Sequence, residues 1–230
     1  MNLGIILTPD ERSKAYLQKI LKNNIILDNI IFMNDNRIKK SYSDNMIELS
    51  KINGFDISKS VIDTLLENNL AFKEFPFVDI NNSKLIKHIQ SLSVDYMIFT
   101  GGGILKHDVL QSGTKFIHLH PGIVPDYRGS TCFYYSILNE NYAGVTAFLM
   151  DENLDTGDIL HQKKFQKPSY QYLDEIYDPH IRSETLIELL QTKKNFVTQM
   201  TKQDPLFGET YYIIHPTLKH IAILNCINDD

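Results

Sequence analysis

Apolar runs alternate with amphipathic segments along the first half of the chain. The run LGIIL at 3–7 ends at TPDE (8–11), where Thr8 is placed to cap a helix and Pro9 suits its first turn. The helix that follows leads into IILDNIIF at 25–32, which has the length and composition of a strand. The opening therefore predicts a β-α-β unit.

The same alternation continues as far as His120. The segment 34–56, rich in Asn, Asp, Ser and Lys, is expected to be irregular or weakly helical. Strands that alternate with helices predict an α/β fold, with a mostly parallel sheet covered by helices on both faces. The further elements expected are helices at about 57–69 and 83–92 and strands near 71–77, 96–100 and 116–120.

The middle of the chain has a different pattern. Two apolar strands at 144–150 and 159–165 are separated only by the loop DENLDTGD, which predicts a hairpin. We expect one main domain over residues 1–168, because a chain of 230 residues accommodates one main core.

The segment after Pro168 is expected to form a small C-terminal appendage over residues 169–230. Its pattern is helical from about 172 to 202 and then changes to an aromatic-rich stretch at 208–224. The appendage should therefore be helical first and then form a short strand or hairpin.

Composition narrows the class of protein. The chain has 43% hydrophobic and 22% charged residues, as globular proteins do, and its net charge of −5 gives no general reason to bind nucleic acid. No apolar run approaches the roughly 20 residues of a membrane span, so no membrane association is expected and the cytoplasm is the expected location. Cys132 and Cys226 show neither metal-ligand spacing nor a disulfide framework, which fits a reducing compartment.

His118 and His120 are the first candidate site residues. Alternation along a strand directs both imidazoles to one face, and Pro121 ends the ladder where a site could open. Two other interpretations remain open: polar strand-end residues with backbone partners, and a metal site. A metal site needs further ligands, and no other cluster at recognisable spacing supplies them.

Asp155 is the second candidate. It lies in a Leu-Asp-Thr-Gly-Asp loop between two strands, where Gly157 permits a tight turn. A carboxylate on such a loop could orient an imidazole, although the same loop also reads as an ordinary solvated turn.

Three glycines at 101–103 superficially resemble a phosphate cradle. They lack the Lys-Ser/Thr end of a P-loop and the spaced glycines of a dinucleotide-binding turn, so neither an ATPase nor an NAD enzyme is indicated. Small residues here would let a flat heterocycle lie against the chain.

The order of these segments resembles one family. HPGIVPDYRG at 120–129, followed by SILNENYAGVT and then by MDENLDTGDIL at 150–160, is similar to the catalytic segment of methionyl-tRNA, glycinamide-ribonucleotide and amino-sugar formyltransferases. The close similarity covers about 116–160. The resemblance implies a Rossmann-like fold and transfer of a formyl group from 10-formyltetrahydrofolate to an amine, without a metal.

The resemblance also assigns roles to site residues. It puts His120 at the family His and Asp155 at the family Asp, whereas the family Asn falls on His118. In the family, the Asn amide donates a hydrogen bond to the formyl oxygen as it becomes an oxyanion. An imidazole can also donate, but it is bulkier and its donor depends on tautomer or charge. Direct attack by the amine is implied, with His118 and His120 stabilising the oxyanion and Asp155 orienting His120.

The folate pocket implied by the resemblance is formed by two loops, one after the strand YMIFT and one that carries the Asp. Apolar side chains with free backbone groups suit a flat pterin, although sheet-helix packing is the ordinary alternative for the first loop. The residues carried over are Gly103, Ile104, Leu105 and Val109 in the first loop, and Met150, Asp151 and Leu154 in the second.

The acceptor is inferred by elimination. The chain is short for a methionyl-tRNA formyltransferase with its RNA-binding domain, and it has TPDE where the glycinamide-ribonucleotide enzymes have a Gly-Ser-rich phosphate loop. This favours a small-molecule acceptor, a nucleotide-linked amino deoxysugar for polysaccharide biosynthesis. A homodimer is left open.

Three rival functions are compatible with the same residues. A hydrolase would release formate from 10-formyltetrahydrofolate without an amine. A non-catalytic relative would bind folate but not turn over, because His118 replaces the family Asn. A metal-dependent hydrolase would be built on His118, His120 and Asp155, and metal analysis would identify it.

Overall fold

The computed structural model describes residues 2–34, 40–101, 103–192, 200–204 and 206–227. It divides into two compact units, Met1–His118 and Leu119–Asp230. Each unit is described below by itself.

The first unit contains parallel strands in the order β3-β2-β1-β4-β5, the order typical of a Rossmann-type sheet. Every residue of β1 and β4 is buried, as expected for strands covered on both faces. The α/β fold class with a mostly parallel sheet is thereby confirmed. The strands are β1 (Leu3–Leu7), β2 (Asn29–Met33), β3 (Lys73–Phe75), β4 (Tyr96–Phe99) and β5 (Lys115–His120).

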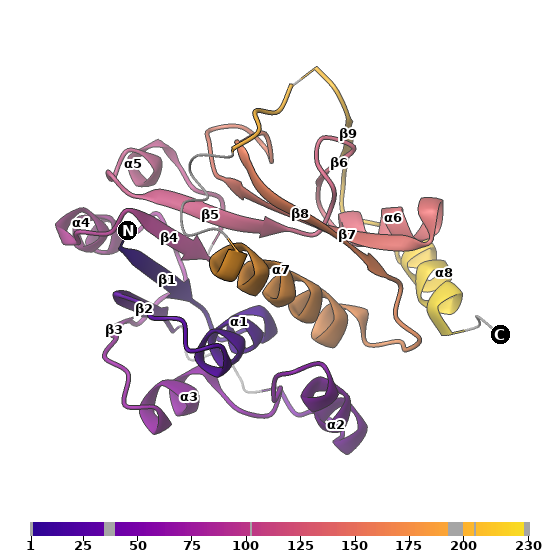
Figure 1. Ribbon diagram of the computed structural model, residues 1–230, viewed down its shortest axis with the longest axis horizontal. Coiled ribbons are helices and arrows are strands. Elements are labelled where there is room, and N and C mark those ends of the chain that lie inside the picture. The colour runs from indigo at the N-terminus through magenta and orange to yellow at the C-terminus, as the bar shows by residue number, and fades with distance from the viewer. Residues whose placement is uncertain (1, 35–39, 102, 193–199, 205, 228–230) are drawn as a thin grey trace. The chain divides into compact units, whose positions relative to one another are not determined.

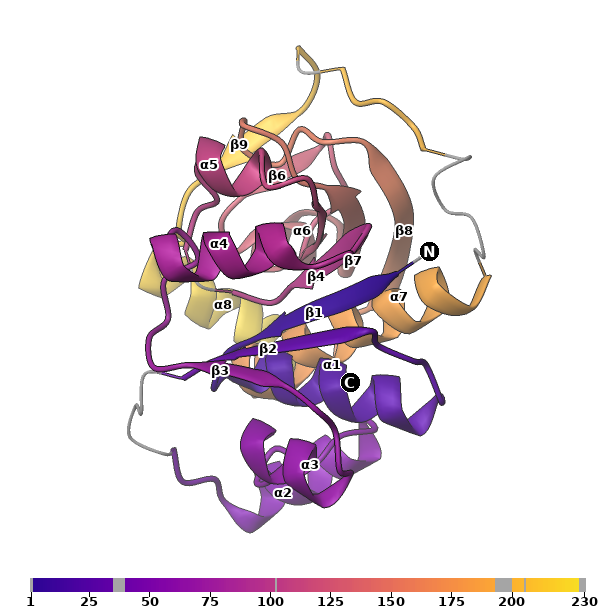
Figure 2. The same cartoon turned by 90° about the vertical axis from the view of Figure 1, so that its left-hand side faces the viewer.

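Helices lie on both sides of these strands, with α4 and α5 on one side and α1 on the other, and α2 and α3 lie below α1 in this view (Figure 2). Asp10, not Thr8, caps α1: its carboxylate accepts from the Ser13 N–H, while the Thr8 hydroxyl donates to Asp10. The helices are α1 (Glu11–Lys22), α2 (Asp44–Ile52), α3 (Val61–Glu67), α4 (Ser83–Ser91) and α5 (His107–Leu110).

Helix α2 lies in the segment for which the sequence predicts irregular or weakly helical structure. Ser43 caps it by accepting from the Met46 N–H. Only Ser50 of this helix is buried, so its apolar residues do not form the continuous face that a sequence pattern would reveal. Residues 35–39 of the same segment lie outside the described residues.

The second unit is built around the antiparallel pair β7 and β8, which confirms the expected hairpin (Figure 1). Helix α7 packs on both strands, and α6 packs on β7. A separate parallel pair, β6 and β9, joins a segment just after β5 to the C-terminal part of the chain. The elements are β6 (Tyr127–Gly129), α6 (Cys132–Glu140), β7 (Tyr142–Leu149), β8 (Ile159–Gln166), η1 (Leu173–Tyr177), α7 (Asp178–Thr192), β9 (Glu209–Tyr211) and α8 (Pro216–Ile227).

The helical segment expected from 172 to 202 is present as η1 and α7 up to Thr192. Residues 193–199 of that segment lie outside the described residues. The strand expected near the end is β9, and the chain then continues as helix α8.

Candidate active site

His120 occupies the end of β5 and is buried, with 1% of its surface exposed. Its Nε2 atom lies 2.8 Å from the main-chain oxygen of Tyr127, and its Nδ1 atom lies 3.3 Å from Oδ2 of Asp155. The ring of Phe148 lies beside it, with 6.2 Å between ring centroids. Both ring nitrogens of His120 are thus directed at oxygen atoms.

These two partners govern the proton on the ring. The Tyr127 carbonyl can only accept, so it favours a proton on Nε2, and a second proton on Nδ1 would then face a carboxylate. Burial lowers the pKa of His120, while the Asp155 carboxylate and the Tyr127 carbonyl act in the opposite direction. The pair His120–Asp155 is therefore a place where one proton can be taken up or released.

Asp155 is held in an uncommon backbone conformation, with φ of 54°, which Asp tolerates better than most residues. Its Oδ2 atom accepts a hydrogen bond of 2.8 Å from the Gly129 N–H in addition to facing His120. Strand β6 therefore supplies a backbone partner to each member of the pair: the Tyr127 carbonyl for His120 and the Gly129 N–H for Asp155.

Gly157 is required by the tight turn of the Asp155 loop. A Cβ atom at this position would lie 1.6 Å from the main-chain oxygen of Leu149, a distance that no side chain can occupy. The loop can therefore close against the end of β7 only because residue 157 is glycine.

Gln203 holds the Asp155 loop from the other side, a role for which the sequence contains no signal. Its Nε2 atom donates to the main-chain oxygens of Asp155 at 3.1 Å and Gly157 at 2.6 Å. Its Oε1 atom accepts from Nε of the buried Arg128 at 3.4 Å, and Arg128 also donates to the Asp204 carbonyl. The C-terminal segment thus takes part in positioning the site.

Arg182 of α7 supports the strand that carries His120, and it also escaped the sequence analysis. It donates from Nη1 to the main-chain oxygen of Leu119 and from Nε to Oδ1 of Asp178 at 2.6 Å. Both charged residues are buried, at 6% and 7% exposure, so they compensate each other's charge. This ion pair fixes the backbone immediately before His120.

His118 lies on the same strand two residues before His120, at the end of the first unit. Its backbone is paired with Phe99 of β4, and the two rings are 6.3 Å apart. The side chain is half-buried. Its role as a donor to the oxyanion stays a prediction.

The residues expected to bind folate are divided between the two units. In the first unit, Leu105 and Val109 are buried, whereas Ile104 is 82% exposed. In the second unit, Leu154 is 58% exposed and the Asp151 carboxylate accepts from the Thr156 hydroxyl and the Asn153 N–H. The remaining members of the set are Gly103, with φ of 101°, and the half-buried Met150.

Among the described residues, no three His, Cys, Asp or Glu side chains come together in a group that could hold a metal ion. Within the same segments, no helix has both the length and the apolarity needed to cross a membrane.

Comparisons with known proteins agree with the sequence resemblance. The methionyl-tRNA formyltransferase of Ehrlichia canis is 31% identical over 161 residues, covering 65% of this chain and 53% of the relative. That of a Nitratiruptor species is 36% identical over 98 residues, covering 42% of this chain and 32% of the relative. The chain thus spans about a third to a half of these curated relatives.

Solved structures show the same fold. The sugar 3N-formyltransferase WlaRD, crystallised in the presence of dTDP and 5-N-formyl-THF, has a TM-score of 0.63 at 18% identity, covering 99% of this chain and 79% of the other. An N-formyltransferase from Helicobacter canadensis, in complex with folinic acid and dTDP-3-aminofucose, has a TM-score of 0.63 at 15% identity, covering 99% and 81%. Residues 41–179, more than half of the sequence, match the family described as formyl transferase, and the chain belongs to that family.

Proposed function

We propose that this protein transfers a formyl group from 10-formyltetrahydrofolate to a primary amine, and that the amine belongs to a nucleotide-linked amino deoxysugar. The observation that carries the proposal is the buried His120 with Asp155 3.3 Å from its Nδ1 atom. These are the two residues that the family resemblance assigns to catalysis.

The folate donor supplies an electrophilic formyl carbon. Ile104 and Leu154 are exposed apolar side chains in the two loops that the family resemblance assigns to folate, and exposed apolar surface suits a flat, partly apolar ligand. The 5-N-formyl-THF and folinic acid named for the two solved structures support the same ligand class for this chain.

The chemistry then requires a hydrogen-bond donor and a proton acceptor. Attack by the uncharged amine places negative charge on the formyl oxygen, and each preorganised donor contributes a factor of about 10² to 10³. Both nitrogens of His120 already face oxygen atoms, so protonated His120 donates to the formyl oxygen only by exchanging its Tyr127 or Asp155 partner, and His118 is a second donor. Asp155 stabilises the protonated ring, and its carboxylate accepts the proton that the amine loses. Collapse of the tetrahedral intermediate then breaks the bond between the formyl carbon and the folate nitrogen, which takes up that proton as tetrahydrofolate leaves.

The acceptor class rests on two further points. The net charge of −5 disfavours a tRNA, and the two solved structures were obtained with dTDP or a dTDP-linked amino sugar. Methionyl-tRNA is the competing acceptor, because the curated relatives are methionyl-tRNA formyltransferases.

The test has two stages. Calorimetric titration with 5-formyltetrahydrofolate, a stable stand-in for the donor, should show micromolar binding, and its absence in folded protein would contradict the proposal. Formylation is then measured with dTDP- and UDP-linked 3-amino and 4-amino sugars and with methionyl-tRNA. Mass spectrometry of the sugar identifies transfer, whereas formate released without any amine would indicate the hydrolase.

A further inference from the structure

A cavity of about 520 Å³ lies wholly within the first unit, beside the carboxyl ends of β1 and β2. Its volume is within the range of roughly 300–1,000 Å³ that is typical of small-molecule sites. Ligands of open α/β sheets bind outside the carboxyl ends of the strands. Among the lining residues, Pro9 to Glu11 follow β1 and Asn34 follows β2.

One wall of the cavity is a chain of hydrogen bonds. Oε1 of Glu11 accepts from the Lys40 ammonium and from the Tyr42 hydroxyl, both at 2.8 Å. The Tyr42 oxygen in turn accepts from Lys14 at 3.2 Å, and Lys14 also donates to the Ile57 carbonyl at 2.6 Å. The Glu11 carboxylate also accepts a backbone N–H, but its two oxygens can accept about four hydrogen bonds in all, and the Lys14 ammonium has a third proton to donate.

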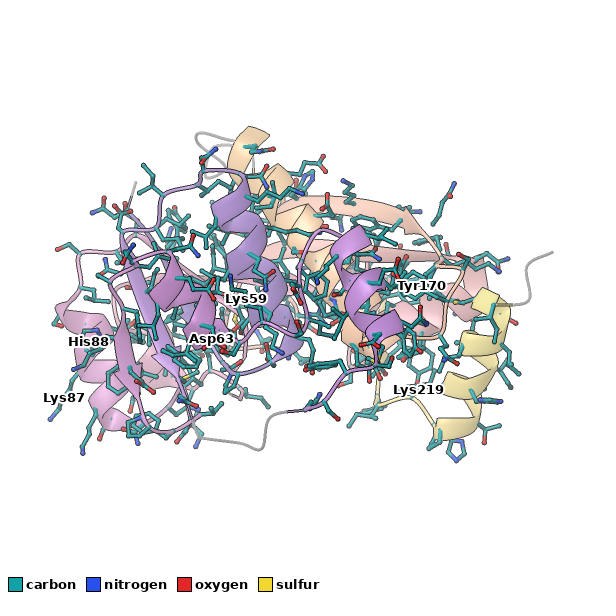
Figure 3. All side chains as sticks on the ribbon, turned by 90° about the horizontal axis from the view of Figure 1, so that it is seen from below. Lys59, Asp63, Lys87, His88, Tyr170 and Lys219 are labelled. Carbon is teal, nitrogen blue, oxygen red and sulfur yellow. The ribbon has the colours of Figure 1, made fainter. Side chains whose placement is uncertain are left out.

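The charges of this wall are nearly balanced. Glu11 is paired with Lys40, and the acidic residues Asp10 and Asp63 also line the cavity (Asp63 is labelled in Figure 3). The three carboxylates that line the cavity, on Asp10, Glu11 and Asp63, oppose the binding of an anion. Adjacent donors and acceptors suit hydroxyl groups better than phosphate, because a hydroxyl can donate to a carboxylate and accept from an ammonium.

The rest of the lining is mixed. Pro9 and Ile62 are half-buried apolar residues, whereas Phe32 and Val61 are only 2% exposed. Asn34, Ser58 and Ser60 add polar groups. The apolar surface of Pro9 and Ile62 can accommodate the face of a flat ring. The cavity therefore combines a surface for a ring with a wall for hydroxyl groups.

We propose that this cavity binds a nucleoside, with the base against Pro9 and Ile62 and the vicinal ribose hydroxyls on Glu11 and Lys14. The inference concerns a second ligand site and does not depend on the formyl-transfer proposal, because the cavity lies in the first unit and His120 and Asp155 lie in the second.

Calorimetric titration of the full chain with uridine and adenosine tests the proposal. At least one nucleoside should bind, and its 2′-deoxy counterpart should bind about tenfold more weakly, because a hydrogen bond to a charged group is lost. Failure of both nucleosides to bind to folded protein would overturn the proposal, as would equal binding of the 2′-deoxy form.

Two variants address the wall itself. Glu11→Gln keeps the shape of the side chain but removes its charge, and it should weaken binding of the same nucleoside about tenfold. Glu67→Gln, at an exposed carboxylate paired with Lys59 outside the cavity lining, is the matched control and should bind like the unmodified protein. If Glu11→Gln does not fold, Tyr42→Phe is the second test. Weaker binding of the nucleoside to this variant supports the site, and unchanged binding overturns it.

Discussion

The Nδ1 atom of His120 lies 3.3 Å from Oδ2 of Asp155, and the same oxygen accepts the Gly129 N–H. A neutral amide at position 155 would keep the Gly129 bond but would not stabilise a protonated imidazole. We therefore expect Asp155→Asn to lower kcat by about 10²-fold or more, with folate affinity little changed. Steady-state formylation and folate titration check this, and a kcat within threefold of the unmodified enzyme would contradict it.

His120→Asn should abolish turnover while the protein stays folded. Because the two residues act as a pair, the double variant His120→Asn/Asp155→Asn should be no slower than His120→Asn alone. If the rate reduction in the double variant equals the product of the two single reductions, Asp155 acts independently of His120. Single-turnover rates of the three variants, with circular dichroism as the folding control, make the comparison.

His118→Asn restores the residue that the family pattern has at this position. An amide always offers an N–H donor, whereas an imidazole does so at a given nitrogen only in the right tautomer or charge state. Activity should be retained or increased. A complete loss in the folded variant, measured in the same formylation assay, would show that the imidazole itself is needed.

Arg182→Met should destabilise the protein by about 3–5 kcal/mol, because Asp178 is left as a buried charge without its ion pair. Removing both charges, in Arg182→Met/Asp178→Leu, should restore part of that free energy of unfolding. Urea unfolding of the two variants measures the difference. Equal stability of the single and double variants would show that Asp178 is compensated by other groups.

Gln203→Leu should reduce kcat about tenfold or more by loosening the loop that carries Asp155. Gln18→Leu is the matched control, since Gln18 makes a similar pair of bonds to the main chain of Asp56 in the other unit. Both variants should lose about 1–3 kcal/mol of stability, but only the first should lose activity. Equal kcat in the two variants would argue against positioning by Gln203.

Glu11 contributes a pH-dependent part of stability. Burial raises its pKa, but Lys40, a backbone N–H and Tyr42 outweigh burial, so the folded-state pKa lies below the ordinary value of 4.5. This contribution is fully present above about pH 4.5 and is lost as the pH falls through the folded-state value. Between pH 7 and pH 3.5, the free energy of unfolding measured with urea should therefore decrease less for Glu11→Gln than for the unmodified protein. Identical losses would contradict the assignment.

The sequence predicts the strands well because each is a short apolar run buried by helices, as with β1 and β4. It also singles out His120 and Asp155 as candidate site residues, whose catalytic roles stay predictions, and only the structure shows that they lie 3.3 Å apart. Gln203 and Arg182 could not be predicted, since they act on main-chain oxygens 48 and 63 residues away along the chain. Contacts to the backbone of distant residues leave no pattern of residue types at fixed spacing.

The oxygen that faces Nε2 of His120 belongs to the main chain of Tyr127, so it is present whatever side chain position 127 carries. The oxygen that faces Nδ1 belongs to the side chain of Asp155 and can be exchanged by a single codon change. A mutation can therefore replace the oxygen atom that faces Nδ1, but it cannot remove the oxygen atom that faces Nε2. Of the two oxygen partners described for this ring, the Asp155 carboxylate is the one that a side-chain substitution can replace to adjust its proton affinity.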